Sequence, residues 1–177
     1  PQLDPTKLAA AFQDGEESED AKNMLSSVGV VHIDGNGVGA IMRDLGSAHS
    51  EAQEAGVRVS ADEVHTEPND ALQAFIMVVN KRLDKTVKDA IALSWYDVQE
   101  LTPDTVVPIV PVLVGGDDVT VYTDGRYAIP FAEAYIRHYE ELTEKDELLK
   151  QLAVIAGAET PGPLTASAGV ALVGSNF

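Results

Sequence analysis

The sequence contains no cysteine. This absence excludes disulfide bonds, zinc sites built from thiolates and cysteine nucleophiles together. The sequence also has no apolar run of the ~20 residues that a helix needs to span a bilayer, so no membrane segment is expected. Hydrophobic residues nevertheless make up 45% of the chain, which is typical of a globular protein with a buried core.

Basic residues are scarce as well. The chain has 12 Lys and Arg against 29 Asp and Glu, which gives a formal net charge of −17. Nucleic-acid backbones and anionic membranes are both bound by basic faces, so we expect this chain alone to bind neither of them directly. A phosphorylated ligand stays compatible with this charge, because a divalent cation reverses the sign of a carboxylate cluster.

The length of 177 residues fits one domain. We expect a helical or mobile lead-in over 1–27 and a single domain over 28–177. The apolar patterns of the domain predict a short helix after residue 39, a loop or lid over 46–68, and a long helix that is capped by Asn69 and ends before Pro103. They also predict strands at 28–33, 106–114, 119–123 and 164–173, and further helices at 129–142 and 144–156.

This order of elements predicts an α/β protein of the α+β kind. Helical crossovers between parallel strands, combined with one hairpin, indicate a mixed sheet with helices packed on it. The alternation of strands and helices favours a ferredoxin-like sheet over a sandwich.

A glycine-rich turn follows the first predicted strand. Three glycines stand among its six residues, which are Asp34, Gly35, Asn36, Gly37, Val38 and Gly39. Such a turn before a helix lets backbone N–H groups approach a phosphate chain. A turn of this composition is also common where no ligand binds, so a purely structural role stays open.

A second acidic turn lies between the predicted strands of the hairpin. Its residues are Gly115, Gly116, Asp117 and Asp118. If the hairpin lies beside the first strand, then Asp34 and the two hairpin acids converge at one edge of the sheet. Clustered carboxylates repel one another unless a cation lies between them, and oxygen ligands suit Mg²⁺ or Mn²⁺.

Taken together, these motifs resemble the palm domain of the nucleotidyl-cyclase and GGDEF superfamily. Val-Gly-Gly-Asp-Asp-Val between strands, after a strand that ends in Asp-Gly-Asn-Gly-Val-Gly, is most similar to the GGDD palm in the large subunit of type III CRISPR effector complexes. Ser167-Ala168-Gly169-Val170-Ala171 is similar to the Ser-Ile-Gly-Val-Ala stretch of GGDEF domains. The resemblance covers about residues 28–173.

The resemblance implies a metal-dependent reaction of nucleoside triphosphate, with ATP expected, that gives a cyclic or oligomeric nucleotide and pyrophosphate. It implies that Mg²⁺ or Mn²⁺ is held by Asp34, the Gly35 carbonyl, Asp117 and Asp118. The two glycine turns would bind nucleotide, and the three acids would be catalytic. It further implies cytoplasmic antiviral defence, in a palm–palm dimer or a larger effector complex.

The sequence also departs from the family pattern. Asn36 replaces the second Asp of the first turn, which removes one charge from the metal site. Met42 and Arg43 stand where GGDEF enzymes have the Asn and Asp that read guanine, so diguanylate synthesis is not expected. The family continues beyond the last strand with a further helix and strand, so a C-terminally truncated palm is expected. An inactive nucleotide-binding or assembly palm is therefore the alternative.

Overall fold

The structure is a computed structural model, and it describes residues 27–60, 70–104 and 106–174. The predicted lead-in over 1–27 thus lies outside the described residues, apart from Ser27, which begins the first strand. The elements follow one another as β1 (Ser27–Gly35), α3 (Val38–Arg43), α4 (Leu45–Glu54), α5 (Ala71–Glu100), β2 (Ile109–Gly115), β3 (Asp118–Asp124), α6 (Ala128–Lys145), α7 (Glu147–Leu152) and β4 (Ala166–Gly174).

The four strands form one sheet in the order β2-β3-β1-β4, and every neighbouring pair is antiparallel. The α+β class is confirmed, but the mixed sheet is wrong. The helical crossovers do join strands that run in the same direction, as expected. Each such pair is separated by a third strand: β3 lies between β1 and β2, and β1 lies between β3 and β4. This is the split arrangement of a ferredoxin-like sheet.

Two local predictions about the helices also need correction. Residues 46–68 were predicted as loop, but α4 occupies Leu45–Glu54, and the Asp44 carboxylate caps it by accepting from the Ser47 N–H. The long helix α5 is capped by Asp70, which accepts from the Gln73 N–H, whereas the predicted cap Asn69 lies outside the described residues. A short polar helix with small buried residues gives a weak apolar pattern, which is why its periodicity was missed.

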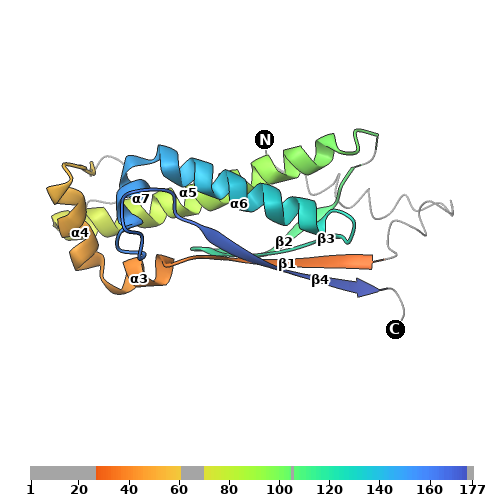
Figure 1. Cartoon of the computed structure of the whole chain (residues 1–177), viewed down its shortest axis with the longest axis horizontal. Helices are drawn as coiled ribbons and strands as arrows, with labels where there is room; N and C mark the ends of the chain where they lie inside the picture. The colour runs from red at the N-terminus through yellow and green to blue at the C-terminus, as the bar shows by residue number, and fades with distance from the viewer. Residues whose placement is uncertain (1–26, 61–69, 105, 175–177) are drawn as a thin grey trace.

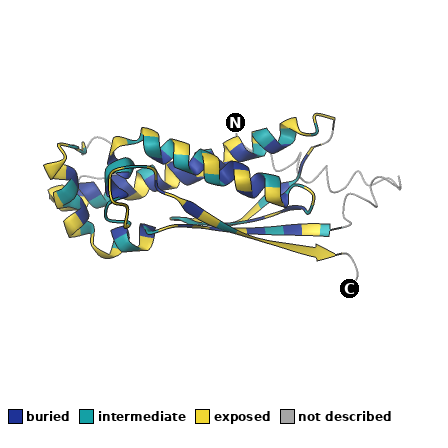
Figure 2. Cartoon of the chain, viewed as in Figure 1, coloured by how far each residue is buried: buried dark blue, intermediate teal, exposed yellow. Residues whose placement is uncertain are grey.

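The helices cover only one face of the sheet (Figure 1). The buried strand residues alternate along β1 and β3, as the pleat requires, and they face α5 and α6 (Figure 2). Val31, Ile33 and Val121 are fully buried on that face. The opposite face carries exposed apolar side chains, including Tyr122 at 44% and Leu113 at 49% exposure.

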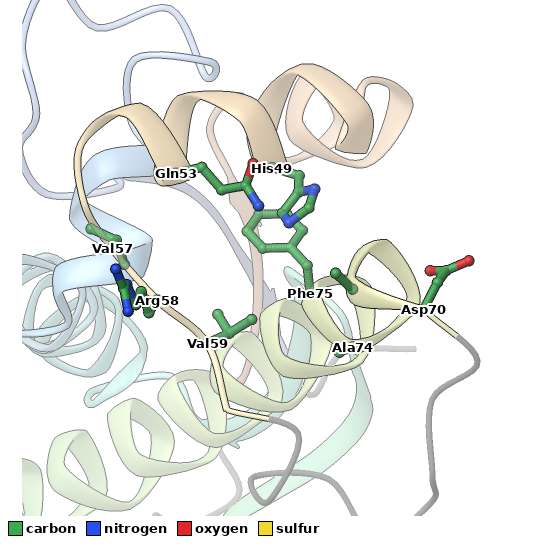
Figure 3. Close-up of a pocket in the computed structure, with 9 residues that line it drawn as sticks. His49, Gln53, Val57, Arg58, Val59, Asp70, Ala74 and Phe75 are labelled. Atoms are coloured by element: carbon green, nitrogen blue, oxygen red, sulfur yellow. The ribbon is translucent and has the colours of Figure 1, made fainter.

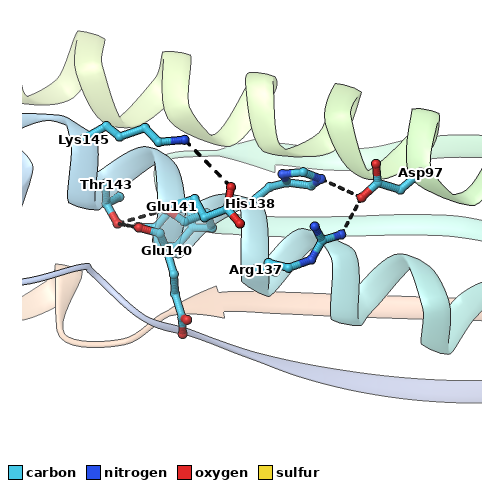
Figure 4. Close-up of polar contacts among 8 residues, drawn as sticks. Asp97, Arg137, His138, Glu140, Glu141, Thr143 and Lys145 are labelled. Carbon is cyan, nitrogen blue, oxygen red and sulfur yellow. Dashed lines mark hydrogen bonds and ion pairs between the residues drawn. The ribbon is translucent and has the colours of Figure 1, made fainter.

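Helices α5 and α6 are joined by a polar contact at one carboxylate (Figure 4). Asp97 of α5 receives an ion pair from Arg137 of α6 and lies 2.7 Å from Nε2 of His138. Partial burial acts to raise the pKa of the Asp97 carboxyl, but these two partners outweigh burial and hold that pKa below its usual value. The contact adds a polar link to the apolar packing between the two helices.

The C-terminal end of α6 is tied to the segment that leads into β4. The N–H of Leu164 donates to Oγ1 of Thr143 at 3.0 Å, and the same hydroxyl lies 2.9 Å from the Tyr139 carbonyl oxygen. Thr143 is fully buried, so water cannot replace these bonds.

We therefore predict that Thr143→Val destabilises the protein by about 1–3 kcal/mol, because the isosteric side chain leaves the buried Leu164 N–H without an acceptor. The measurement is urea unfolding followed by circular dichroism. The matched control Thr143→Ser keeps the hydroxyl and should lose less stability than the valine variant. Equal stability of the valine variant and the wild type would contradict the proposed anchoring of β4.

Candidate active site

Asp34 stands near the end of β1, on the face of the sheet that the helices leave uncovered. It is exposed, while its neighbours Ile33 and Gly35 are buried on the helix side. Ile33 pairs with Val119 of β3, so the next step of the antiparallel ladder brings Asp34 opposite Asp118. Side chains at directly opposite positions of a ladder share a face. Asp34 and Asp118 are thus neighbours on the uncovered face.

The predicted hairpin with Gly-Gly-Asp-Asp at its tip is confirmed. Gly115 pairs with Asp118, which leaves Gly116 and Asp117 as the two turn residues. Gly116 has a φ of +62°, whereas Asp117 does not have a positive φ. A positive φ at the first turn residue alone is the pattern of a type II′ turn, which suits glycine at that place. The turn therefore needs Gly116 and presents Asp117 at its tip.

Asp117 lies on the other side of the sheet edge, against Gly35. A Cβ placed on Gly35 would come within 2.9 Å of the Asp117 Cβ and 3.2 Å of the Tyr139 hydroxyl oxygen. Glycine at position 35 is what allows the hairpin tip to approach β1 so closely. The structure thus brings the three predicted acids to one end of the sheet, with Asp34 and Asp118 on one face and Asp117 on the other.

The three carboxylates interact electrostatically. Partial burial raises the pKa of the Asp117 carboxyl above its usual value, and the negative charges of Asp118 and Asp34 raise it further. This is the expected result when like charges are held together without a counter-ion. The end of the sheet is therefore a place where binding a cation relieves repulsion.

The described residues contain no group of three or more His, Cys, Asp or Glu side chains arranged to hold a metal ion. By the register and the hairpin turn, Asp34 and Asp118 lie on one face of the sheet and Asp117 on the other. The chemistry of the donors still fits a hard divalent cation, since all of them are carboxylate or carbonyl oxygens. Asp34 and Asp118 come opposite each other on the uncovered face, and Asp117 lies against Gly35.

The glycine turn after Asp34 has a clear packing role. Gly37 has a φ of +76°, and a Cβ on it would lie 2.5 Å from the Ala156 carbonyl oxygen. Val38 is fully buried and belongs to the core, so its side chain cannot touch a ligand. Gly39 is exposed, and a Cβ there would meet no atom within 4 Å among the described residues. Neither the backbone conformation nor the packing therefore requires a glycine at position 39.

Asn36 connects the turn to the last strand. Its side-chain N–H₂ donates to Oγ1 of Thr165, and its side-chain oxygen accepts from the Ser167 hydroxyl at 2.9 Å. The Asn36 backbone N–H also donates to the Thr165 carbonyl. An aspartate could not donate as Asn36 does, so these contacts require an amide side chain at this position. The Asn36 side chain is directed at β4 rather than at the acids.

Tyr139 is a site residue that the sequence reading did not find. It is 1% exposed, and its hydroxyl has no hydrogen-bond partner among the described residues. Burial raises the pKa of the Tyr139 phenol, and the charges of Asp117 and Asp34 raise it further, which shows that this hydroxyl lies close to the acids. The only signal in the sequence is an aromatic residue on an amphipathic helix, and packing explains such a residue equally well.

A separate cavity of about 580 Å³ lies between α4 and α5 (Figure 3). His49 and Gln53 of α4 face Phe75 of α5 across it, and the His49 ring lies 4.9 Å from the Phe75 ring. None of the acids or turn glycines lines this cavity. It is therefore distinct from the predicted site. Its α4 residues belong to the segment 46–68, for which the sequence predicts a loop or lid.

No helix within the described residues is both long and apolar enough to cross a membrane. Comparisons with known proteins give no family, since no protein-family model matches the chain and no curated protein matches it.

Gly37 and Gly39, which stand on either side of Val38, allow a matched test of the packing role. We predict that Gly37→Ala destabilises the protein by about 2 kcal/mol or more, because alanine is strained at positive φ and its Cβ would clash with Ala156. Gly39→Ala should leave the stability unchanged or raise it by about 0.5–1 kcal/mol, because alanine favours a helix. Thermal unfolding of both variants decides this. Equal losses in the two variants would contradict the packing role assigned to Gly37.

Proposed function

We propose that this chain is a divalent-metal-dependent nucleotidyltransferase or cyclase palm. It converts nucleoside triphosphate, with ATP as the expected substrate, into a cyclic or oligomeric nucleotide signal and releases pyrophosphate. The supporting observation is the convergence of Asp34, Asp117 and Asp118 at one end of an antiparallel sheet with ferredoxin-like order. The resemblance of the two acidic turns to the GGDD palms supplies the reaction class.

In the proposed reaction the 3′-hydroxyl oxygen attacks the α-phosphorus. The new P–O bond forms as the bond to the pyrophosphate oxygen breaks, and pyrophosphate leaves with that electron pair. Asp117 or Asp118 takes up the proton of the attacking hydroxyl. Bound Mg²⁺ or Mn²⁺ would supply positive charge to the phosphate oxygens. Asp34 and the Gly35 carbonyl would complete the set of oxygen ligands.

Gly39, Gly115 and Gly116 are the turn residues that support nucleotide binding in this proposal. At each of them an added Cβ would meet no described atom within 4 Å. Backbone that is free of side chains can approach a phosphate group closely. For Asn36, Gly37 and Val38 the contacts with β4, Ala156 and the core support an indirect role, in which they shape the turn.

The proposed setting is cytoplasmic antiviral defence, within a palm–palm dimer or a larger effector complex. The uncovered face of the sheet supports a partner of this kind, because it exposes apolar side chains such as Leu113 and Tyr122. Val173 of the edge strand β4, which pairs with the exposed Val28 on the same face, is 37% exposed. Large exposed apolar areas are typical of surfaces that other proteins cover. The net charge of −17 argues that any nucleic acid is bound by the partners.

A second candidate is an inactive palm that binds nucleotide or serves in assembly. Two observations favour it. The Asn36 side chain is hydrogen-bonded to Thr165 and Ser167, which leaves it turned away from the acids. The described residues also contain no group of three acidic side chains arranged to hold a metal ion. Titration of ATP and of GTP by calorimetry, with and without Mg²⁺, followed by chromatography of the mixture, separates the two candidates. Metal-dependent binding with intact nucleotide would favour the inactive palm.

We predict that the double variant Asp117→Asn, Asp118→Asn loses turnover by at least about 100-fold, as expected when charged groups that act on the reacting atoms are removed. The fold should stay intact, because the substitutions remove repulsion between like charges. Product formation is measured by chromatography, and folding by circular dichroism.

The control for the double variant is Asp104→Asn. Asp104 is exposed and precedes the end of β2 that is remote from Gly115, so this variant changes the net charge without touching the site. It should keep wild-type turnover. Undiminished product formation by the double variant would refute the enzyme proposal.

A further inference from the structure

The hydroxyl of Tyr139 is an unusual group to find in the core. Tyr139 comes from α6 and packs almost parallel to Tyr135, with ring centroids 6.0 Å apart and an interplanar angle of 12°. Both rings are about 1% exposed, and neither hydroxyl has a hydrogen-bond partner among the described residues. Leaving a buried hydroxyl unpaired is costly, so natural cores rarely contain one without a reason.

The Tyr139 hydroxyl lies on the same side of Gly35 as the Asp117 side chain. A Cβ on Gly35 would lie 3.2 Å from the Tyr139 oxygen and 2.9 Å from the Asp117 Cβ, so Gly35 separates the hydroxyl from the hairpin tip only by its backbone. Burial raises the pKa of the Tyr139 phenol, and the negative charges of Asp117 and then Asp34 raise it further. A protonated phenol is a hydrogen-bond donor, and a carboxylate is only an acceptor.

We propose that Tyr139 is a positioning residue of the acidic site, whose hydroxyl donates a hydrogen bond to the Asp117 carboxylate when the site holds a divalent cation. A bound cation would favour the ionised form of the acids, and the Tyr139 phenol would then hold the Asp117 carboxylate in one orientation. Gly35 leaves the path between the two side chains open. The inference deepens the proposed function, since it concerns the metal site on which that function rests.

The positioning role and a structural role predict opposite changes in stability when the Tyr139 hydroxyl is removed. If the hydroxyl served to stabilise the fold, its removal would destabilise the metal-free protein. Because it has no hydrogen-bond partner among the described residues, its removal should leave the stability of the protein without added metal unchanged or raise it. The loss should then be visible only when the cation binds.

The test uses Mn²⁺ alone as the probe, measured by isothermal titration, with Tyr139→Phe as the variant and Tyr135→Phe as the matched control. Tyr135 has the same ring packing and the same unpaired hydroxyl, but it lies one helical turn earlier in α6. Its hydroxyl is not among the three nearest atoms that a Cβ on Gly35 would meet, whereas the Tyr139 hydroxyl is. Tyr139→Phe should weaken Mn²⁺ binding about tenfold, the effect of losing a hydrogen bond to a charged group. Tyr135→Phe should change it less than about twofold.

The same three proteins are unfolded in urea without metal. Neither variant should have a lower midpoint than the wild type. Three results would overturn the proposal: no Mn²⁺ binding by the wild type, equal Mn²⁺ affinity of Tyr139→Phe and the wild type, or a lower midpoint of metal-free Tyr139→Phe.

Turnover is not needed for this test, so its outcome is separable from that of the enzyme proposal. A wild type that binds Mn²⁺ but makes no product, together with the tenfold loss in Tyr139→Phe, would end the enzyme proposal and support the role of Tyr139.

Discussion

The antiparallel register of β1 is the constraint on which the rest of the structure depends. β1 pairs with β4 along Ser27–Gly35 and with β3 from Val28 to Ile33. These two ladders decide that Asp34 comes opposite Asp118 on one side and opposite Ser167 on the other. A shift of one residue would move every side chain of β1 to the opposite face and would bury Asp34 beneath the helices.

The same register explains why the acids gather without forming a closed metal site. Alternation along the strands puts Asp34 and Asp118 on the uncovered face, while the type II′ turn carries Asp117 to the helix side, against Gly35. Repulsion among three carboxylates favours such a separation in the absence of a cation.

The turn after Asp34 has a packing role, and the proposed function adds nucleotide binding to it. Gly37 and Asn36 attach it to the end of α7 and to the approach to β4, while Gly39 stays open. These attachments hold the end of β1 rigidly beside the hairpin tip. A rigid support of this kind is what a reaction site needs, because small displacements of the acting groups reduce catalysis strongly.

The sequence by itself determined the elements and the candidates. Continuous apolar runs bounded by Gly and Asp identified the strands, and the two acidic turns identified Asp34, Asp117 and Asp118, because these are local signals. Helix α4 was not predicted because its apolar pattern is weak. The cap of α5 was predicted at Asn69 instead of Asp70, because Asn and Asp are both favoured at a helix cap and stand next to each other here.

Only the tertiary structure decided the pairing of the strands and the surroundings of the acids. Strand order depends on contacts between segments far apart in the chain, so no local pattern could show that each crossover spans an intervening strand. The face on which Asp117 lies depends on the turn geometry and on Gly35, and the approach of the Tyr139 hydroxyl depends on how α6 packs over β1. Periodicity along one helix tells which side is buried, but not what that side meets.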